Sequence, residues 1–460
     1  MTRFNPRRNT LEREEHKYTL QDVPEPNLFR DIFSYDKVPR ITFNHRIVPM
    51  TPPDDMWVTD TTFRDGQQAM KPFSVKQIVD LFDMLHKLSG PKGVIRQSEF
   101  FLYSEKDREA VEKCRERGYR YPEVTSWIRA NKNDFKLVKD IGIKETGILT
   151  SASDYHIFMK LKKTRKQAMD EYIAIAEEAL ENGITPRCHF EDITRADIYG
   201  FVVPFAQRLM ELAKQGKSVV KIRMCDTLGY GVTYPGVSLP RSVQGIVYSL
   251  RYYAEVPSEW LEWHGHNDFY RGLVNASTAW LYGCSACNGT LVGIGERTGN
   301  TPIEGLIIEL LQLRGGEEQV DTTVITEIAQ YFEKEIGYSI PSNAPIIGQE
   351  FNLTRAGIHA DGLFKNEEIY NIFNTEKLLH RPVVIAISEK SGTAGVSQWA
   401  NNYLHLTGIN RITKDNPGVQ KIHQHIEAEY AKGRTTTISN TELVEMGEKY
   451  LPEYFKKVTT

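Results

Sequence analysis

Several features of secreted, membrane and nucleic-acid-binding proteins are scarce or missing in this sequence. The chain of 460 residues has only five cysteines, an odd and scattered set that argues against a disulfide scaffold and favours a reducing compartment. It has no run of about 18 apolar residues, which argues against a membrane-spanning helix. Its net charge of −3 argues against a strongly basic nucleic-acid-binding protein. The first residues lack the apolar stretch of a secretory signal, so we expect a cytoplasmic protein with no membrane or nucleic-acid partner.

The length and composition are those of a folded protein with more than one domain. Hydrophobic residues make up 40% and charged residues 25% of the chain, both ordinary values. Residues 1–55 are rich in charge, proline and aromatics without a sustained period, which predicts an extension that wraps the main domain or a partner chain, or a partly disordered arm. Residues 56–315 alternate between strand-like and helix-like stretches, and residues 316–460 are mostly helical and polar.

The alternating region contains eight short apolar segments, most of them separated by amphipathic helical stretches. This count over about 260 residues predicts a (β/α)₈ TIM barrel, an α/β fold. An open doubly wound sheet is the alternative, but it would favour a glycine-rich phosphate turn after the first strand, where this chain has Arg64-Asp65-Gly-Gln-Gln68. The segments are residues 56–63, 94–101, 123–130, 143–149, 184–191, 219–226, 261–266 and 288–295.

A His-x-His pair ends the seventh of these segments. If residues 260–264 form a strand, His264 and His266 share one face at its carboxyl end, because alternate residues of a strand point the same way. Active sites of barrel enzymes lie at that end, and neutral imidazole is a common metal ligand. Taken alone, the pair also fits two histidines held by ordinary hydrogen bonds.

An Arg-Asp pair follows the first strand. Asp65 would lie at the same face as the histidines, because only one strand separates the first strand from the seventh in a closed barrel. A carboxylate with two imidazoles leaves metal positions open for a substrate. Arg64 would place positive charge beside a developing oxyanion. The alternative is a surface ion pair between Arg64 and Asp65 with little effect on stability.

Two further predicted strands end in polar residues. After the eighth strand, the glycines of residues 293–300 permit close approach to a ligand, and Asn300 offers an amide oxygen to a metal; a plain turn is the alternative. At the end of the fifth strand, Arg187, His189 and Glu191 share one face. A guanidinium there could clamp a carboxylate, or Arg187 could pair with Glu191 inside the barrel.

The Cys-x-x-Cys sequence at Cys284 and Cys287 has the spacing of a zinc or redox motif. The chain has no second such pair and no histidine at zinc-finger spacing. We therefore expect both cysteines to be small buried residues near the eighth strand.

Together, the segments DTTFRDGQQ, HGHND and GTLVGIGERTGN, in this order, resemble the DRE-TIM metallolyases. Within that superfamily they resemble the Claisen-condensing group of 2-isopropylmalate, homocitrate, citramalate and Re-type citrate synthases. GIHADGLFKN at 357–366 and SEKSG at 388–392 also resemble this group, so the likeness spans residues 57–400. It implies a metal-dependent acyltransferase that condenses acetyl-CoA with a 2-oxo acid, in a homodimer or larger homo-oligomer.

The resemblance also implies a metal site. Asp65, His264 and His266 would bind a divalent ion, with Asn300 as a nearby or weak fourth ligand. We expect Mn²⁺, and oxygen and imidazole ligands also suit Mg²⁺, Co²⁺ or Zn²⁺.

Roles for the surrounding residues follow from the same resemblance. Arg64 would polarise the carbonyl of the 2-oxo acid, and Gln68 would line the pocket. Glu191 and Thr227 would contact the carboxylate or hydroxyl region of that acid. His359 and Tyr370 would supply acid–base chemistry at the barrel mouth of a partner subunit, with helical subdomains of residues 316–460 exchanged across the dimer.

The identity of the 2-oxo acid depends on a few positions. Arg187 resembles the arginine that grips the distal carboxylate in homocitrate synthases, which argues against the apolar pocket of isopropylmalate synthases. His189 stands in place of a usual serine, and Gln97-Ser-Glu99-Phe-Phe replaces Glu-x-Gly-Phe-Pro, so we expect a smaller pocket. The long N-terminal arm and the phenylalanine in TTFRDGQQ resemble Re-type citrate synthases. We therefore expect oxaloacetate as acceptor and citrate as product, with homocitrate formation from 2-oxoglutarate as the first alternative and 2-isopropylmalate or citramalate formation next.

Two hypotheses lie outside this reaction class. TTFRD also resembles the carboxyltransferase barrel of biotin-dependent pyruvate carboxylases, but no biotinyl-lysine motif of the AMKM type is present, and AMKP at 69–72 lies inside the predicted barrel. The other is a degenerate barrel that acts as a binding module. The joint presence of Arg64, Asp65, His264 and His266 argues against it.

Overall fold

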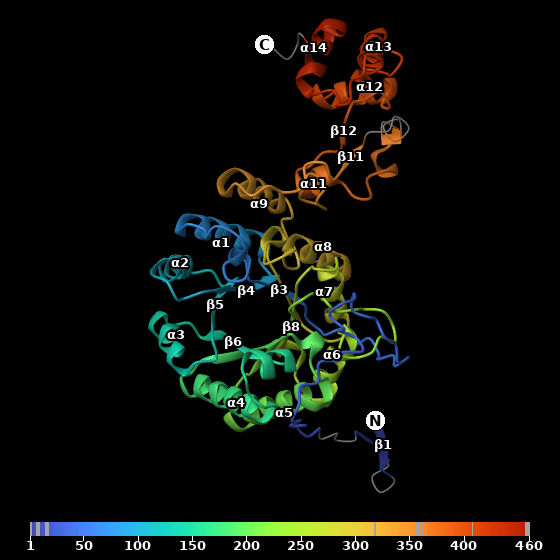
Figure 1. Cartoon of the computed structure of the whole chain (residues 1–460). Helices are drawn as coiled ribbons and strands as arrows, with labels where there is room; N and C mark the ends of the chain where they lie inside the picture. The colour runs from blue at the N-terminus through green and yellow to red at the C-terminus, as the bar shows by residue number, and fades with distance from the viewer. Residues whose placement is uncertain are drawn as a thin grey trace. The chain divides into compact units, whose positions relative to one another are not determined.

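The computed structural model describes residues 2–5, 10–13, 18–316, 319–354, 359, 362–363, 365–406 and 408–455 of the chain. The chain divides into two compact units, Met1–Asp321 and Thr322–Thr460 (Figure 1). The first unit carries the N-terminal segment and an α/β barrel, and the second is mostly helical.

Eight parallel strands close into a barrel in the order β10-β3-β4-β5-β6-β7-β8-β9. Each of the eight segments expected from the sequence contributes one strand, so the predicted TIM barrel is confirmed. β3 and β9 are both neighbours of β10, which places the ends of the first and seventh barrel strands close together. The strands are β3 (Trp57–Asp60), β4 (Ile95–Phe100), β5 (Glu123–Ile128), β6 (Glu145–Ser151), β7 (Thr185–Glu191), β8 (Lys221–Asp226), β9 (Leu261–Gly265) and β10 (Ala286–Gly289).

The barrel strands alternate between apolar residues that face the helices and polar residues that face the interior. In β7, Phe190 stacks on Phe205 of α5 with ring centroids 4.8 Å apart. Arg187 lies three residues before Phe190, so its side chain points to the opposite face, into the barrel. There it donates a hydrogen bond to Glu99 of β4. The interior of this barrel is therefore unusually rich in charge.

Helices surround the barrel, and several begin at a capping box. The side chains of Ser74 and Thr164 accept hydrogen bonds from the N3 backbone N–H groups of α1 and α4. The side chains of the N3 residues, Gln77 and Gln167, accept hydrogen bonds from the backbone N–H groups of the two capping residues. Such boxes satisfy backbone N–H groups that a helix leaves unpaired at its start. The helices are α1 (Val75–Ser89), α2 (Glu105–Glu116), α3 (Phe135–Ile141), α4 (Arg165–Glu181), α5 (Val203–Gly216), α6 (Val243–Tyr248), α7 (Gly272–Leu281) and α8 (Ile303–Arg314).

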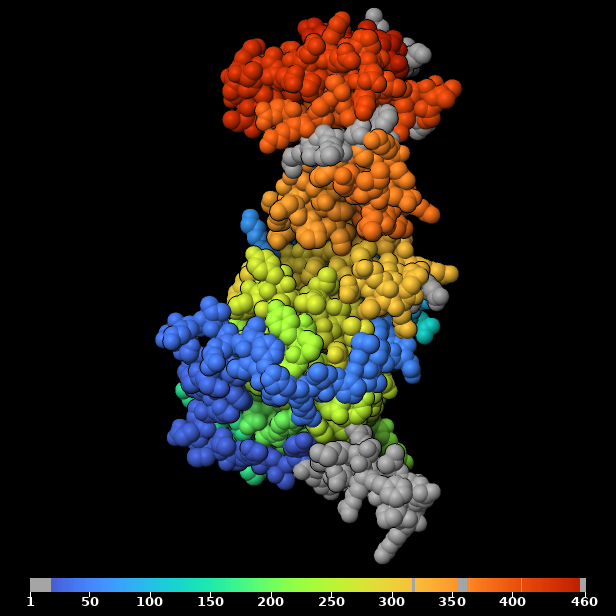
Figure 2. All heavy atoms as spheres, turned by 90° about the vertical axis from the view of Figure 1, so that its right-hand side faces the viewer, coloured from blue at the N-terminus to red at the C-terminus, as the bar shows by residue number. Residues whose placement is uncertain are grey.

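The N-terminal segment begins with two short paired strands, β1 (Thr2–Asn5) and β2 (Thr10–Arg13), and residues 18–55 then run along the barrel of their own chain. The backbone N–H of Gln21 donates to Gly200, Arg241 donates to the carbonyl of Pro39 at 3.1 Å, and the N–H of Thr51 donates to Leu281. Figure 2 shows the blue surface of this segment against the yellow-green surface of the later barrel elements. These contacts tie the segment to loops that follow β7 and β8 and to the end of α7.

The second unit has its own apolar core, which confirms the mostly helical C-terminal region expected from the sequence. Trp399, Ile422 and Leu443 come from three helices and are buried together in it. Of the motif at 357–366, residues 357, 358, 360, 361 and 364 lie outside the described part of the chain. The elements are α9 (Val324–Tyr331), β11 (Leu353–Thr354), α11 (Thr375–Leu379), β12 (Val384–Ile385), α12 (Gly392–Tyr403), α13 (Pro417–Ala431), α14 (Asn440–Tyr450) and α15 (Pro452–Phe455).

Membrane-crossing helices are not found among the described residues, since none of these helices combines the length and the apolar character that a bilayer span requires.

Candidate active site

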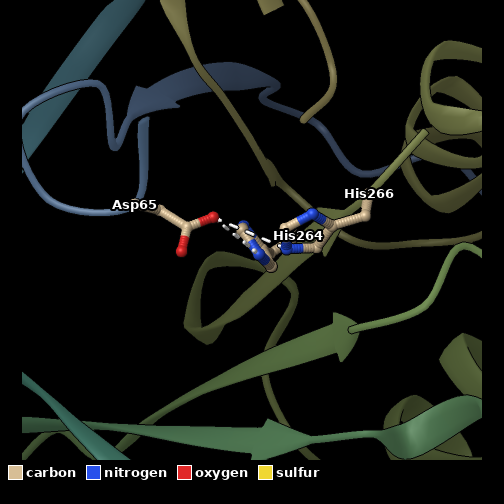
Figure 3. Close-up of side chains that lie close together, drawn as sticks. All are labelled: Asp65, His264 and His266. Carbon is tan, nitrogen blue, oxygen red and sulfur yellow. Dashed lines mark ion pairs between the residues drawn. The ribbon is translucent and has the colours of Figure 1, made fainter. Parts of the chain in front are cut away.

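Asp65, His264 and His266 converge at the carboxyl end of the barrel strands (Figure 3). Asp65 lies in the loop after β3, His264 is in β9, and His266 follows that strand. One ligand atom from each residue lies within 4.8 Å of the others. The Nε2 atoms of His264 and His266 are 3.7 and 3.5 Å from Oδ2 of Asp65. The structure thus brings together all three residues that the sequence suggested as metal ligands.

The protonation states at this cluster are those that a metal requires. Burial lowers the pKa of His264 to about 4 and also lowers the pKa of His266, so both imidazoles are neutral at pH 7. Burial alone would raise the pKa of Asp65, but the charge of the neighbouring Arg64 guanidinium holds it below its usual value. The cluster therefore presents one carboxylate and two neutral imidazoles, the forms in which these side chains bind metals.

Unpaired polar atoms support the same interpretation. Oδ2 of Asp65, Nδ1 of His266 and Oδ1 of Asn300 are buried and have no hydrogen-bond partner among the described residues. A backbone bridge between His266 and Asn300 places these two residues side by side. Buried polar atoms without partners are costly, and a cation relieves that cost for oxygen ligands. The donor set of this cluster therefore fits a divalent metal ion.

Asn288, which the sequence motifs do not indicate, holds one of the two histidines in place. Its Oδ1 lies 2.8 Å from Nδ1 of His264, and its Nδ2 donates to Oγ1 of Thr59 at 2.9 Å. Because an amide oxygen only accepts, Nδ1 of His264 carries the proton and Nε2 presents its lone pair toward Asp65. The only sequence signal for this role is the position of Asn288 in the predicted strand beside that of His264.

Arg64 connects the cluster to the charged interior of the barrel. It donates from Nη1 to Oδ1 of Asp65 at 2.9 Å and from Nε to Oε1 of Glu99 at 2.8 Å. Its guanidinium carbon lies 5.6 Å from the ring centroid of Trp127. Arg64 and Asp65 are only 9% and 5% exposed, so the alternative of a surface ion pair is wrong. The guanidinium is therefore held beside the carboxylate of Asp65 at the carboxyl end of the barrel strands.

The comparisons with known proteins agree with this geometry. Residues 56–332 match the family model described as HMGL-like. The chain is 57% identical over 458 residues to a Citrate (Re)-synthase of Syntrophus aciditrophicus (strain SB), covering 99% of this chain and 73% of that protein. It is 56% identical over 442 residues to a Citrate (Re)-synthase of Clostridium kluyveri, covering 96% of this chain and 98% of the relative. This chain belongs to the HMGL-like family, among the Re-type citrate synthases.

The membership confirms the resemblance to the Claisen-condensing group that the ordered motifs indicated. Among solved structures, an HMG-CoA lyase of Bacillus subtilis aligns with a TM-score of 0.51 at 18% identity and covers 64% of this chain and 97% of its own. At that identity the likeness supports the barrel fold alone.

Arg187 and Glu191 pair with other residues in this protein and not with each other. Arg187 is 1% exposed and donates to Glu99 at 2.6 Å and to Glu145 at 2.8 Å. Glu191 instead lies 2.8 Å from Nδ1 of His156. The prediction of an ion pair between Arg187 and Glu191 is therefore wrong, because three other carboxylates, from β4, β6 and β9, already face the guanidinium.

The other predicted substrate residues differ in exposure. His189 is 2% exposed, and its Nε2 has no hydrogen-bond partner among the described residues. Thr227 is half-buried, and its hydroxyl accepts a hydrogen bond from the backbone N–H of Asp192 at 2.8 Å. Gln68 is exposed, whereas its neighbour Gln67 is buried. Of these, His189 is the one with an unsatisfied nitrogen inside the barrel.

His359 and Tyr370 lie in the second unit. Their ring centroids are 4.4 Å apart, and both side chains are exposed. The pair is thus assembled within its own unit and accessible there.

Cys284 and Cys287 are fully buried, as expected. Burial raises the pKa of both thiols. Because a thiolate is the form that binds zinc or attacks a disulfide, the prediction of structural cysteines is confirmed by their surroundings.

Proposed function

We propose that this protein condenses the acetyl group of acetyl-CoA with the ketone of oxaloacetate and, after hydrolysis of the thioester by water, releases citrate and CoA. The observation that carries the proposal is the 57% identity to a Citrate (Re)-synthase across 99% of the chain. The cluster of Asp65, His264 and His266 supports it, because a 2-oxo acid offers neighbouring carboxylate and ketone oxygens to a metal.

A divalent ion at this cluster, for which we propose Mn²⁺, would supply Lewis acidity to the ketone oxygen of the acceptor. Asp65, His264 and His266 would hold the ion, and Asn300 would offer its unpaired amide oxygen. The hydrogen bond with Asn288 holds His264 in the tautomer whose Nε2 would be available to bind the ion.

Arg64 and Glu191 are proposed to act on the acceptor. Arg64 stabilises the negative charge that develops on the ketone oxygen as the carbon–carbon bond forms, because its guanidinium is fixed beside Asp65. Burial would raise the pKa of Glu191, but the hydrogen bond with His156 and the charge of that histidine lower it to about 2. A carboxylate with so low a pKa is a weak base, so we assign Glu191 to accept a hydrogen bond from the product hydroxyl rather than to remove a carbon-bound proton.

Removal of a proton from the acetyl methyl group is assigned to His359, with Tyr370 beside it. We further propose that these two residues serve the barrel of a partner subunit in a cytoplasmic homodimer. The pocket of the acceptor is proposed to be lined by Arg187, His189, Thr227 and Gln68.

The experiment that tests the function is an acceptor panel. The purified protein is incubated with acetyl-CoA, Mn²⁺ and one of oxaloacetate, 2-oxoglutarate, pyruvate or 2-oxoisovalerate, and free thiol is followed while the product is identified. We expect oxaloacetate to exceed each other acid by about 100-fold in kcat/KM, since a site with buried polar groups discriminates strongly. Turnover of 2-oxoglutarate without turnover of oxaloacetate would reject citrate formation in favour of homocitrate formation.

A further inference from the structure

Glu99 is a carboxylate that three arginines share inside the barrel. It is 1% exposed and lies in β4. Its Oε1 accepts from Nε of Arg64 at 2.8 Å and from Nη1 of Arg223 at 2.9 Å, and its Oε2 accepts from Nη2 of Arg187 at 2.6 Å. Burial alone would raise its pKa, but the arginines, with Arg223 the strongest, hold that pKa well below the usual value. Glu99 is therefore a permanent anion in the middle of the barrel.

Both terminal nitrogens of Arg187 are occupied by protein groups. Nη1 donates to Glu145 at 2.8 Å and to Gln97 at 3.1 Å. Nη2 donates to Glu99 at 2.6 Å and to Thr125 at 3.3 Å. A guanidinium with this many partners already has what a bound carboxylate would offer it.

Glu99 also connects Arg187 to the metal cluster. Arg64 bridges Asp65 and Glu99, so Glu99 lies on the path of contacts from the cluster to Arg187. Nε2 of His189 is 3.5 Å from Oε2 of Glu99 and has no hydrogen-bond partner among the described residues. A ligand that extends from the cluster toward Arg187 therefore encounters Glu99 and His189.

Gly147 of β6 provides the space for these two side chains. A Cβ at this position would lie 2.5 Å from Nε2 of His189 and 2.9 Å from Oε2 of Glu99. Both distances are shorter than real Cβ contacts, so this stretch of β6 has no room for a side chain while His189 and Glu99 keep their places.

We propose that Glu99 sets the length of the acceptor: its carboxylate takes the position on Arg187 and Arg223 that the distal carboxylate of a longer 2-oxo dicarboxylic acid would occupy. The inference rests on the proposed function, and it adds a residue that determines specificity. The four-carbon acid ends short of Glu99. One further methylene group brings a second anion against Glu99 in a buried site, where like charges repel strongly.

Shortening Glu99 by one methylene tests this directly. Glu99→Asp keeps the negative charge that the arginines need. It withdraws the carboxylate by about one carbon–carbon bond, roughly 1.5 Å, which is also the difference in length between the two acids. We expect the ratio of kcat/KM for 2-oxoglutarate to kcat/KM for oxaloacetate to rise at least 10-fold. A folded variant with an unchanged or lower ratio overturns the inference.

Glu145→Asp is the matched control. Glu145 also pairs with Arg187, but its other ion pair is with Lys221, and it makes no described contact with Arg64. We expect its acceptor ratio to stay within about twofold of the wild type. A shift as large as that of Glu99→Asp would mean that loosening Arg187, rather than moving Glu99, changes the ratio, and it would also overturn the inference.

A measurement on the unaltered protein keeps the proposal testable if the variant does not fold. 2-Oxovalerate and 2-oxoglutarate have the same carbon chain, but only the second ends in a carboxylate. Both acids are measured as competitive inhibitors against oxaloacetate. We expect 2-oxovalerate to bind at least 10-fold more tightly than 2-oxoglutarate. Tighter binding of 2-oxoglutarate overturns the role of Glu99. If the wild-type protein releases no CoA with oxaloacetate, the proposed function is wrong. Calorimetric measurement of the affinity for the two acids then still decides the role of Glu99.

Discussion

Glu304 is a single carboxylic acid whose burial makes the stability of the barrel depend on pH. It lies in the first turn of α8, is 7% exposed, and its Oε2 accepts a hydrogen bond from the backbone N–H of Val292 at 3.1 Å. Burial raises the pKa of Glu304 from its ordinary value of 4.5 to about 7. Because the folded-state pKa is the higher one, the stability associated with the protonated form is fully present below pH 4.5 and is lost as the pH rises through 7.

Glu304→Gln removes this ionisation and keeps the shape of the side chain. We expect the free energy of unfolding of the variant, relative to wild type, to increase by about 2 kcal/mol between pH 5.5 and pH 8.5. Urea unfolding at several pH values measures this difference. Glu211→Gln, an exposed position in α5, serves as the control and should show no such trend. A difference for Glu304→Gln that is the same at all pH values would contradict the assignment.

At this scale, the sequence was sufficient for residues whose role depends on local spacing. Asp65, His264 and His266 stand at the ends of predicted strands, and barrel topology alone makes such ends converge. Glu99 and Asn288 could not be assigned in this way. Glu99 depends on Arg187 of β7, and Asn288 depends on His264 of β9. Which residues meet in this way is set by the register of the strands and not by a local pattern.

The loop of residues 293–300 after β10 places Asn300 beside His266, one of the proposed metal ligands. Gly299 has a φ of +87°, a backbone conformation that side chains rarely adopt. At Gly295, a Cβ would lie 2.2 Å from Nδ2 of Asn300. The glycines of this loop thus allow the backbone to pack closely around Asn300, one of the loop's own residues.

Gly295→Ala should therefore displace Asn300. We expect the affinity for Mn²⁺ to fall by about 10-fold, the loss typical when groups that support a metal site are moved. Isothermal titration of the metal-free protein with Mn²⁺ measures it. Gly216→Ala at the end of α5, where a Cβ would lie at an ordinary contact distance of 3.4 Å from Oγ of Ser218, is the control. Unchanged affinity in Gly295→Ala would remove Asn300 from the proposed ligand set.

Periodicity predicted the barrel strands because one face of each strand packs on helices with apolar residues. It could not predict the charged interior, since inward residues such as Arg187 and Arg223 look like any other polar residue of an alternating strand. Their burial is tolerated because Glu99, Glu145 and Glu262 supply the opposite charges.

For the whole molecule, the central question is whether one chain contains a complete site. The proposed metal ligands belong to the first unit, and His359 and Tyr370 belong to the second. The proposed exchange across a dimer assigns the acid–base pair of one chain to the barrel of another. The sequence could place these residues in separate regions, but it could not place the N-terminal segment. Its contacts with the barrel join residues far apart in the sequence, such as Gln21 with Gly200 and Arg46 with Tyr199, and no local pattern predicts them.

Mixing two inactive variants tests the exchange. Asp65→Asn lacks a metal ligand, and the double variant His359→Ala with Tyr370→Phe lacks the acid–base pair. After subunits are allowed to re-equilibrate, half of the dimers are mixed and each mixed dimer has one intact site, so we expect about a quarter of wild-type activity. Each variant mixed with itself is the control. A mixture with no activity, despite proven formation of mixed dimers, would place both parts of the site in the same chain.

The most direct test of the central claim is the joint measurement of bound metal and CoA release in wild type and His264→Ala. We predict about one divalent ion per wild-type chain and thiol release with oxaloacetate that a chelator abolishes and Mn²⁺ restores. His264→Ala should lose the ion and at least about 1,000-fold in kcat, whereas His425→Ala, an exposed histidine of α13, should keep both. A folded His264→Ala protein with the metal content and rate of wild type would contradict the account.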